Sequence, residues 1–287
     1  MNHTGRRSGL LFVVSAALSL LALAGIHAQG PTPRAIAPID LTGYWVSVVT
    51  EDWRFRMVTP AKGDYASVPL NPEGRKVADT WDPAKDEAAG TQCKSYGAAA
   101  LMRVPGRLHI TWENDTTLRI DTDAGTQTRM LRFGAAQPQA GEPQWQGESV
   151  AQWEGPAFAP ARGFGPGGPG PGPGPGAGPG PGRGAGPGAG PGPGRGGRGG
   201  PARGGSLKVV TTHLRPGYLR KNGVPYSGNT VLTEYMDRTN EPNSDSWLIV
   251  TTIVEDPQYL AQAFITSTHF KKQADASGWN PTPCAAK

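Results

Sequence analysis

Apolar and polar residues alternate with a period of two through much of the chain after residue 40. In 108–112 every second side chain is apolar, a pattern that predicts a strand with one buried face. Similar segments, rich in Val, Ile, Thr and aromatic residues, occur at 44–49, 118–122, 128–133, 149–153, 207–214, 231–238, 247–254 and 263–271. Short turns such as Asn114-Asp115 join these segments, which favours antiparallel pairing.

About nine strands without regular intervening helices predict an all-β fold. The architecture is either an antiparallel up-and-down barrel, lipocalin-like, or a β-sandwich. Residues 51–105 form a long excursion after the first strand, in which 71–79 predicts a short helix with Asn71 as its cap and Pro72 at the first helical position. We expect 215–227 to be a long loop.

Residues 156–205 interrupt this pattern, because they are almost entirely Gly, Pro, Ala and Arg. A segment without apolar period cannot bury enough surface to offset the entropy of ordering, so we predict a disordered insertion in a surface loop. The segments 29–155 and 206–287 are then the first and second parts of one β domain.

The first 28 residues have the order of a secretory signal peptide. Arg6 and Arg7 precede an apolar run from Leu10 to Ala24, and Ala28 offers a small residue for cleavage. We therefore predict a periplasmic or secreted protein that begins near Gln29 and has no transmembrane span after cleavage.

The net charge of +5 does not describe the folded part of the chain. Removing the two arginines of the leader and the five of the insertion leaves 21 basic against 23 acidic residues. The basic character belongs to the insertion, and an exported chain with a near-neutral domain predicts no nucleic-acid partner.

Cys93 and Cys284 are the two cysteines of the chain. A single pair in an oxidising compartment usually forms a disulfide, so we predict this bond. It would tie the C-terminal tail to the excursion between the first two strands.

The sequence contains no nucleotide-binding loop, zinc-finger spacing, Gly-x-Ser-x-Gly elbow or His-Glu-x-x-His helix. We predict no cofactor and no metal. His109, His213 and His269 all fall in predicted strands, and Glu234 shares a face with Leu232 and Met236. If these faces pointed into a barrel, His213, Glu234 and His269 would be candidates for acid–base catalysis.

The loop 215–227 contains three cations and two tyrosines and could recognise an anionic or aromatic group at a pocket entrance. The candidate ligand-binding residues are His109, Trp112, Arg215, Tyr218, Tyr226 and Tyr235.

Two resemblances rest on short motifs. Gly43-Tyr44-Trp45 is similar to the Gly-x-Trp that begins the first strand of lipocalins, whose Trp plugs the closed end of the barrel. More of the chain resembles a family of secreted bacterial proteins of unassigned function. The shared segments are 40–45 (DLTGYW), 69–75 (PLNPEGR), 81–83 (WDP), Cys93, 223–227 (GVPYS), 232–235 (LTEY), 255–259 (EDPQY) and Cys284. That family commonly has His where this chain has Tyr226, so a role built on that His does not carry over.

These observations leave three hypotheses for function. The first is a periplasmic or secreted protein that binds a small apolar or aromatic ligand in a β-barrel pocket. The second is a barrel enzyme that uses His/Glu acid–base or metal chemistry, and the third is a cell-envelope interaction protein without a pocket. Converging titratable side chains would favour the second, and an apolar lining would favour the first.

Overall fold

A computed structural model of the chain describes residues 30–134, 141–155 and 205–287. Residues 32–287 belong to one compact unit. The predicted leader and, apart from Gly205, the predicted insertion lie outside the described residues.

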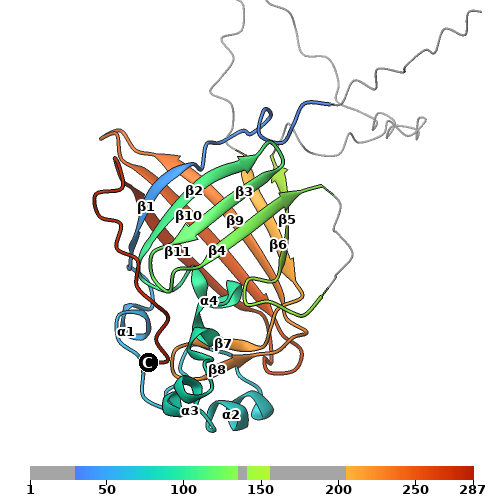
Figure 1. The fold of residues 1–287 in the computed structure, drawn as a ribbon, viewed down its shortest axis with the longest axis vertical. Helices are drawn as coiled ribbons and strands as arrows, with labels where there is room; N and C mark the ends of the chain where they lie inside the picture. Colours follow the sequence, from blue (N-terminus) through green and yellow to red (C-terminus); the bar gives the residue numbers. More distant parts are fainter. Residues whose placement is uncertain (1–29, 135–140, 156–204) are drawn as a thin grey trace, which may run out of the picture. The chain divides into compact units, whose positions relative to one another are not determined.

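Nine strands close into a barrel, in the order β1-β11-β10-β9-β6-β5-β4-β3-β2 (Figure 1). They are β1 (Gly43–Val48), β2 (Arg107–Asn114), β3 (Thr117–Thr122), β4 (Thr128–Phe133), β5 (Glu148–Glu154), β6 (Ser206–Thr212), β9 (Val231–Asn240), β10 (Ser246–Glu255) and β11 (Phe264–Lys272). The alternating pattern therefore located the strands, and of the two predicted architectures the barrel is confirmed.

One pair of strands departs from the predicted antiparallel order. β4 and β5 run parallel, with Leu131 opposite Ser149 and Phe133 opposite Ala151. Parallel neighbours cannot be joined by a tight hairpin, and in the sequence residues 134–147 separate β4 from β5. The barrel is thus mixed.

The alternation of apolar and polar residues in the sequence corresponds to side chains that point alternately into and out of the barrel. β10 alternates buried and half-buried residues along its whole length up to Glu255. Leu118, Ile120, Leu131, Leu207, Met236 and Val250, each at most 1% exposed, belong to one interior cluster with Trp45 and Phe270. Burial of this apolar face stabilises the barrel by roughly 25 cal/mol for each Å² removed from water.

The barrel interior also holds an ion pair. Arg129 of β4 donates to both carboxylate oxygens of Glu234 of β9, at 3.2 and 2.7 Å. Both side chains are fully buried. Arg129 also donates to Thr211 Oγ1 at 3.2 Å and Ser149 Oγ at 3.5 Å, so the charges are compensated and hydrogen-bonded.

The Trp of the Gly-x-Trp motif is part of the core. Trp45 is fully buried, and its indole N–H donates to the carbonyl oxygen of Leu41 at 2.9 Å. Lys272 lies 4.6 Å from the centre of the ring, which adds a cation–π contact. Gly43 has a φ of 107°, a backbone conformation that residues with a Cβ rarely adopt, so the conformation favours glycine at this position.

Short helices and a small hairpin lie at one end of the barrel (Figure 1). They are α1 (Trp53–Arg56), α2 (Pro72–Ala78), α3 (Pro83–Ala88), the 3₁₀ helix η1 (Gln92–Tyr96), α4 (Ala98–Leu101), β7 (Gly217–Arg220) and β8 (Val224–Tyr226). The predicted helix at 71–79 is confirmed as α2, where Asn71 Oδ1 accepts from Gly74 N at 2.8 Å. The alternating pattern did not predict the other helices, because each has only six residues or fewer.

Two predictions about 207–227 were wrong. The strand at 207–214 ends at Thr212, because His213 adopts a φ of 55° that a strand cannot continue. The segment 215–227 is not a simple loop, since β7 and β8 pair antiparallel within it. Asp256, which follows β10, anchors the end of this segment. Its carboxylate accepts hydrogen bonds from the backbone N–H and hydroxyl of Ser227 at 2.6 and 2.9 Å.

The insertion starts and ends at neighbouring strand ends. Glu154, at the end of β5, lies opposite Ser206, at the start of β6. A direct hairpin would join these two strands with a few residues. The barrel therefore needs nothing from 156–204 for its own connectivity.

Candidate functional site

A pocket of about 320 Å³ lies among α1, η1, α4, β7 and the C-terminal tail. Four cations line it, together with aromatic and aliphatic side chains. The cations are Arg56, Arg103, Arg220 and Lys221. The concentration of buried guanidinium groups at one cavity makes it the strongest candidate for a binding site.

One wall of the pocket is the single helical turn α1, which the buried side chain of Arg56 anchors. The Asp52 carbonyl accepts from Phe55 N at 2.8 Å and Arg56 N at 3.1 Å, which defines α1. The Arg56 side chain is only 1% exposed. It donates through Nε to the carbonyl of Arg103 at 2.9 Å and pairs through Nη1 with Glu51. Burial lowers the pKa of Arg56, and the carboxylate of Glu51 opposes that shift.

Asp52 is shared by two further arginines. Arg103 Nη2 donates to Asp52 Oδ2 at 2.9 Å, and Arg220 Nη2 lies 3.8 Å from the same oxygen. Arg220 also donates through Nη1 to the carbonyl of Ala66 at 2.6 Å, and its guanidinium lies 4.3 Å from the centre of the Phe55 ring. Burial, and then the neighbouring charge of Arg103, lower the pKa of Arg220 to about 10. One carboxylate therefore faces two buried cations.

The two arginines keep N–H groups without acceptors. Among the described residues, no hydrogen-bond partner reaches Arg103 Nη1 or Arg220 Nε and Nη2, and all three atoms are buried. A buried charged donor without an acceptor costs at least about 1–3 kcal/mol. Both arginines line the pocket, so the positive charge that the described chain compensates only in part lies beside the cavity.

Lys221 and Tyr96 complete the polar side of the pocket. Lys221 Nζ lies 5.0 Å from the centre of the Tyr96 ring. No carboxylate of the described chain forms an ion pair with Lys221. Cations outnumber carboxylates by two even when the exposed pair Arg54–Asp64 is included. The pocket is consequently an electropositive site.

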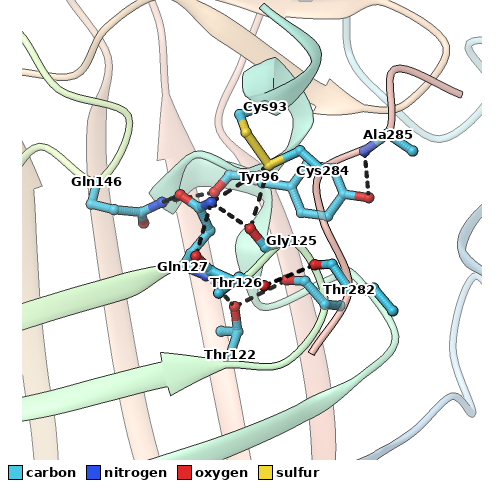
Figure 2. Close-up of a disulfide and its surroundings, with 11 residues drawn as sticks. Cys93, Tyr96, Thr122, Gly125, Thr126, Gln127, Gln146, Thr282, Cys284 and Ala285 are labelled. Carbon is cyan, nitrogen blue, oxygen red and sulfur yellow. Dashed lines mark hydrogen bonds between the residues drawn. A yellow bond between two sulfur atoms is a disulfide. The ribbon is translucent and has the colours of Figure 1, made fainter. Parts of the chain in front are cut away.

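The C-terminal tail forms another part of the wall, and a disulfide holds it there (Figure 2). The predicted bond between Cys93 and Cys284 is confirmed, with an S–S distance of 2.07 Å. Thr282, which lines the pocket, donates its backbone N–H to the carbonyl of Asp123 at 2.8 Å. Figure 2 shows Tyr96 beside the disulfide, and its hydroxyl accepts from Ala285 N at 3.4 Å.

Gly125 makes room for the Tyr96 ring. Its φ of 77° lies in the left-handed region, and a Cβ there would come within 2.2 Å of Tyr96 Cδ1. Gln127 Nε2 donates to the Gly125 carbonyl at 2.6 Å and fixes the turn (Figure 2). The turn between β3 and β4 thus determines where the aromatic wall of the pocket stands.

The three candidate catalytic residues lie in different surroundings. Glu234 is inside the barrel, paired with Arg129. His269 is on the outer face, where its Nδ1 lies 2.9 Å from Thr50 Oγ1 and 3.5 Å from Glu51 Oε2. His213 follows β6 and donates through Nε2 to the carbonyl of Gly141 at 3.1 Å. The structure does not bring the three together.

His109 and Trp112 lie on opposite faces of β2, as the alternation predicts. His109 stacks on Tyr44 on the outer face, with ring centres 4.0 Å apart, and lines a second cavity of about 330 Å³ with Trp279. Trp112 packs against the barrel core, 5.6 Å from Phe133. They do not share a site.

None of the remaining ligand-binding candidates lines the pocket. Arg215 lies 4.4 Å from the ring centre of Trp145, and Tyr218 donates to Asp86 Oδ2 at 2.9 Å. Tyr226 is only 1% exposed, and its hydroxyl has no partner among the described residues. Tyr235 is outside the barrel, 5.6 Å from Lys208 Nζ. The predicted cationic segment does reach the pocket, but through Arg220 and Lys221.

Sequence reasoning missed Arg56 and Arg103. Each lies in the excursion 51–105, more than 100 residues from Arg220, and neither belongs to a known motif. Their only signal was the position of an arginine beside apolar residues in short segments such as Leu101-Met102-Arg103. That signal does not predict which of the arginines will meet.

Across 30–134, 141–155 and 205–287, no three His, Cys, Asp or Glu side chains gather in a way that could hold a metal ion. None of the described helices has the length and apolar character needed to cross a membrane.

Comparison of the chain with family models, curated proteins and solved structures finds no match. The pocket must therefore be interpreted from its own chemistry.

Proposed function

We propose that the protein binds a small organic anion in the pocket between α1, α4, β7 and the C-terminal tail. Arg103, Arg220 and Lys221 hold the anionic group, while Phe55 and Val58 contact an apolar or aromatic body. The observation that carries this proposal is that Arg56, Arg103, Arg220 and Lys221 line one cavity while Arg103 and Arg220 share a single carboxylate. An anion bound there would be attracted by positive charge that the described chain compensates only in part.

Binding fits the pocket better than acid–base catalysis. Arg220, with a pKa of about 10, remains protonated at neutral pH, so it attracts an anion and does not exchange a proton. The candidate catalytic groups Glu234 and His269 lie in the barrel interior and on its outer face. We therefore favour a binding protein over a barrel enzyme.

The proposal revises the ligand expected from the sequence. A lipocalin-like protein would hold an apolar ligand inside the barrel, but that interior is occupied by the buried cluster around Trp45, Leu131 and Phe270 and by the Arg129–Glu234 pair. The proposed site lies beyond one end of the barrel and adds an anionic group to the ligand. The disulfide supports export to an oxidising compartment, as the predicted leader also does.

Two fluorescent probes of similar shape test the proposal. Anilinonaphthalene sulfonate carries an anionic group, whereas N-phenylnaphthylamine is neutral. We expect saturable binding of the sulfonate at low micromolar concentration and at least roughly tenfold weaker binding of the neutral probe, because charged hydrogen bonds contribute about 1.5–3 kcal/mol each.

A matched pair of variants locates the site. Lys221→Gln removes a cation that lines the pocket, while Lys76→Gln removes one from the exposed face of α2. We expect Lys221→Gln to weaken sulfonate binding roughly tenfold and Lys76→Gln to leave it unchanged. Equal affinity of both variants, or equal binding of the two probes, would refute an anion site at this pocket.

A further inference from the structure

The segment 53–58, which consists of α1 and the two residues after it, exposes three large apolar side chains beside the pocket. Trp53 is 66% exposed, Met57 60% and Val58 69%. Isolated exposed apolar residues are normal on protein surfaces, but three within six consecutive residues form a patch. Met57 and Val58 also line the pocket, so the patch is continuous with its mouth.

The exposure is built into the fold. Arg56, in the middle of this segment, points inward and bonds to the Arg103 carbonyl and to Glu51. The backbone is held by the helical turn from Asp52, so Trp53 and Met57 are kept on the outside while Arg56 is buried. A segment that could fold its apolar residues away would lower its free energy by about 25 cal/mol for each Å² covered. In this protein, the hydrogen bonds of Arg56 prevent the segment from folding its apolar side chains away.

The charges around the patch are cationic on the outside. Arg54 is 68% exposed, and Lys62 is exposed in the same segment. Glu51 and Asp52 pair with the buried Arg56 and Arg103, and Asp64 pairs with the exposed Arg54 at 2.8 Å; each of these carboxylates is 27% exposed. Arg54 and Lys62 together exceed the single exposed partner Asp64 by one charge, so a partner that approaches this surface meets apolar side chains beside a net positive charge.

We propose that residues 53–58 dock on the surface of an anionic lipid bilayer, with the mouth of the pocket facing the lipid. Trp is the residue most suited to the boundary between headgroups and acyl chains. Met57 and Val58 enter the outer part of the acyl region, while Arg54 and Lys62 contact lipid phosphates. This docking surface goes beyond the proposed function, since it rests on exposed residues and not on the occupancy of the pocket.

Charge argues against a second copy of the chain as the occupant. A symmetric dimer places the same patch on both sides of the interface. Contact through Trp53 and Val58 would then bring together two surfaces that each carry Lys62 and the Arg54–Asp64 pair, and so the same net positive charge. An anionic bilayer provides the opposite charge instead.

Flotation with lipid vesicles tests the docking surface. The full mature chain is mixed with vesicles of phosphatidylcholine alone, or with vesicles containing about one quarter phosphatidylglycerol. We expect binding to the anionic vesicles, decreasing as salt rises, and at least roughly fivefold less binding to the neutral ones.

The variants separate this patch from other exposed apolar residues. Trp53→Ser should weaken vesicle binding roughly tenfold, and Trp53→Ser with Arg54→Gln should weaken it further. Ile265→Ser is the matched control, because Ile265 is 62% exposed on the outer face of β11, and it should bind like the wild type. Thermal unfolding of each variant checks that the fold is intact.

Three results would overturn the inference. They are absence of binding to anionic vesicles, equal losses for Trp53→Ser and Ile265→Ser, and a concentration-dependent dimer that Trp53→Ser abolishes. Sulfonate binding measured without vesicles should be unchanged in Trp53→Ser, since Trp53 does not line the pocket. A failure of the pocket appears in that titration, and a failure of docking appears in the flotation.

Discussion

Arginines are buried both in the barrel interior and at the pocket beyond its end, but their ion-pair and hydrogen-bond partners differ. Inside the barrel, Arg129 faces one carboxylate of its own and two hydroxyls, and only its Nε lacks an acceptor. At the pocket, Arg103 and Arg220 share Asp52 and leave three nitrogen atoms without acceptors. Arg129 therefore has a carboxylate to itself, whereas Arg103 and Arg220 share one.

The difference distinguishes a structural charge from a binding charge. A buried cation that already has its anion gains little from a ligand and loses much when its partner is removed. A buried cation that shares its anion gains from a ligand and loses little when it is itself removed. Stability and affinity should therefore respond in opposite ways in the two regions.

The largest effect is expected from Glu234→Gln, which leaves Arg129 buried without a counter-charge. We expect the free energy of unfolding to fall by about 3–5 kcal/mol. Urea unfolding measures this loss. Replacing both partners, with Arg129→Met and Glu234→Leu, should restore most of the stability, and a double variant as unstable as the single one would contradict a compensated pair.

Removing the disulfide should affect the pocket region more than the barrel. Cys93→Ser with Cys284→Ser frees the tail that carries Thr282, and we expect the free energy of unfolding to fall by about 3 kcal/mol. Anilinonaphthalene sulfonate should bind more weakly because the tail wall is no longer fixed. The far-ultraviolet circular dichroism of the strands should be preserved, and its loss would show that the barrel also depends on the bond.

Arg220→Gln should change stability little and weaken sulfonate binding, whereas Glu234→Gln mainly lowers stability. Arg103 repels Arg220, so removing the charge costs little, and we expect stability to change by no more than about 1 kcal/mol. Sulfonate affinity should fall roughly tenfold, which corresponds to about 1.4 kcal/mol. Probe titration and urea unfolding on the same sample measure both. A large loss of stability with unchanged affinity would place Arg220 among the structural charges.

The smallest effect is expected from Tyr226→Phe. The Tyr226 hydroxyl is buried without a partner, and burial raises the pKa of this phenol strongly, which shows how poorly its surroundings solvate charge. Deleting the hydroxyl should stabilise the protein by about 1 kcal/mol. Tyr65→Phe is the control, since Tyr65 donates to Asp79 at 2.9 Å, and it should destabilise by a similar amount. If thermal unfolding shows that both Tyr226→Phe and Tyr65→Phe lower the stability, the Tyr226 hydroxyl is not unpaired.

Much of the barrel could be predicted from the sequence because strand alternation is a local signal. The strand at 128–133 has the predicted bounds, and that at 247–254 differs from β10 by one residue at each end. The parallel placement of β5 beside β4 could not be predicted, since register across the sheet depends on distant partners. The hairpin of β7 and β8 was missed because its strands have four and three residues, too few to establish a period.

The site was harder to predict than the fold. The cationic segment 215–227 was identified, but the residues chosen within it were Arg215, Tyr218 and Tyr226, whereas Arg220 and Lys221 line the pocket. Which face of a four-residue strand turns inward depends on the helices packed against it, and those helices have little sequence signal of their own. The histidines attracted attention by their chemistry, yet the alternation that put His109 and His269 on outer faces was itself visible in the sequence.

The placement of β1 determines when folding can be completed. β1 lies between β2 and β11, so Trp45 is opposite Leu108 on one side and Lys272 on the other. β1 is synthesised before the other strands but cannot complete its pairing until β11 has been made. Any chain that ends before β11 therefore leaves two open sheet edges. Contacts so distant in sequence make for slow folding, and open edges invite pairing with other chains. A chain of this design cannot close its barrel until β11 has been synthesised.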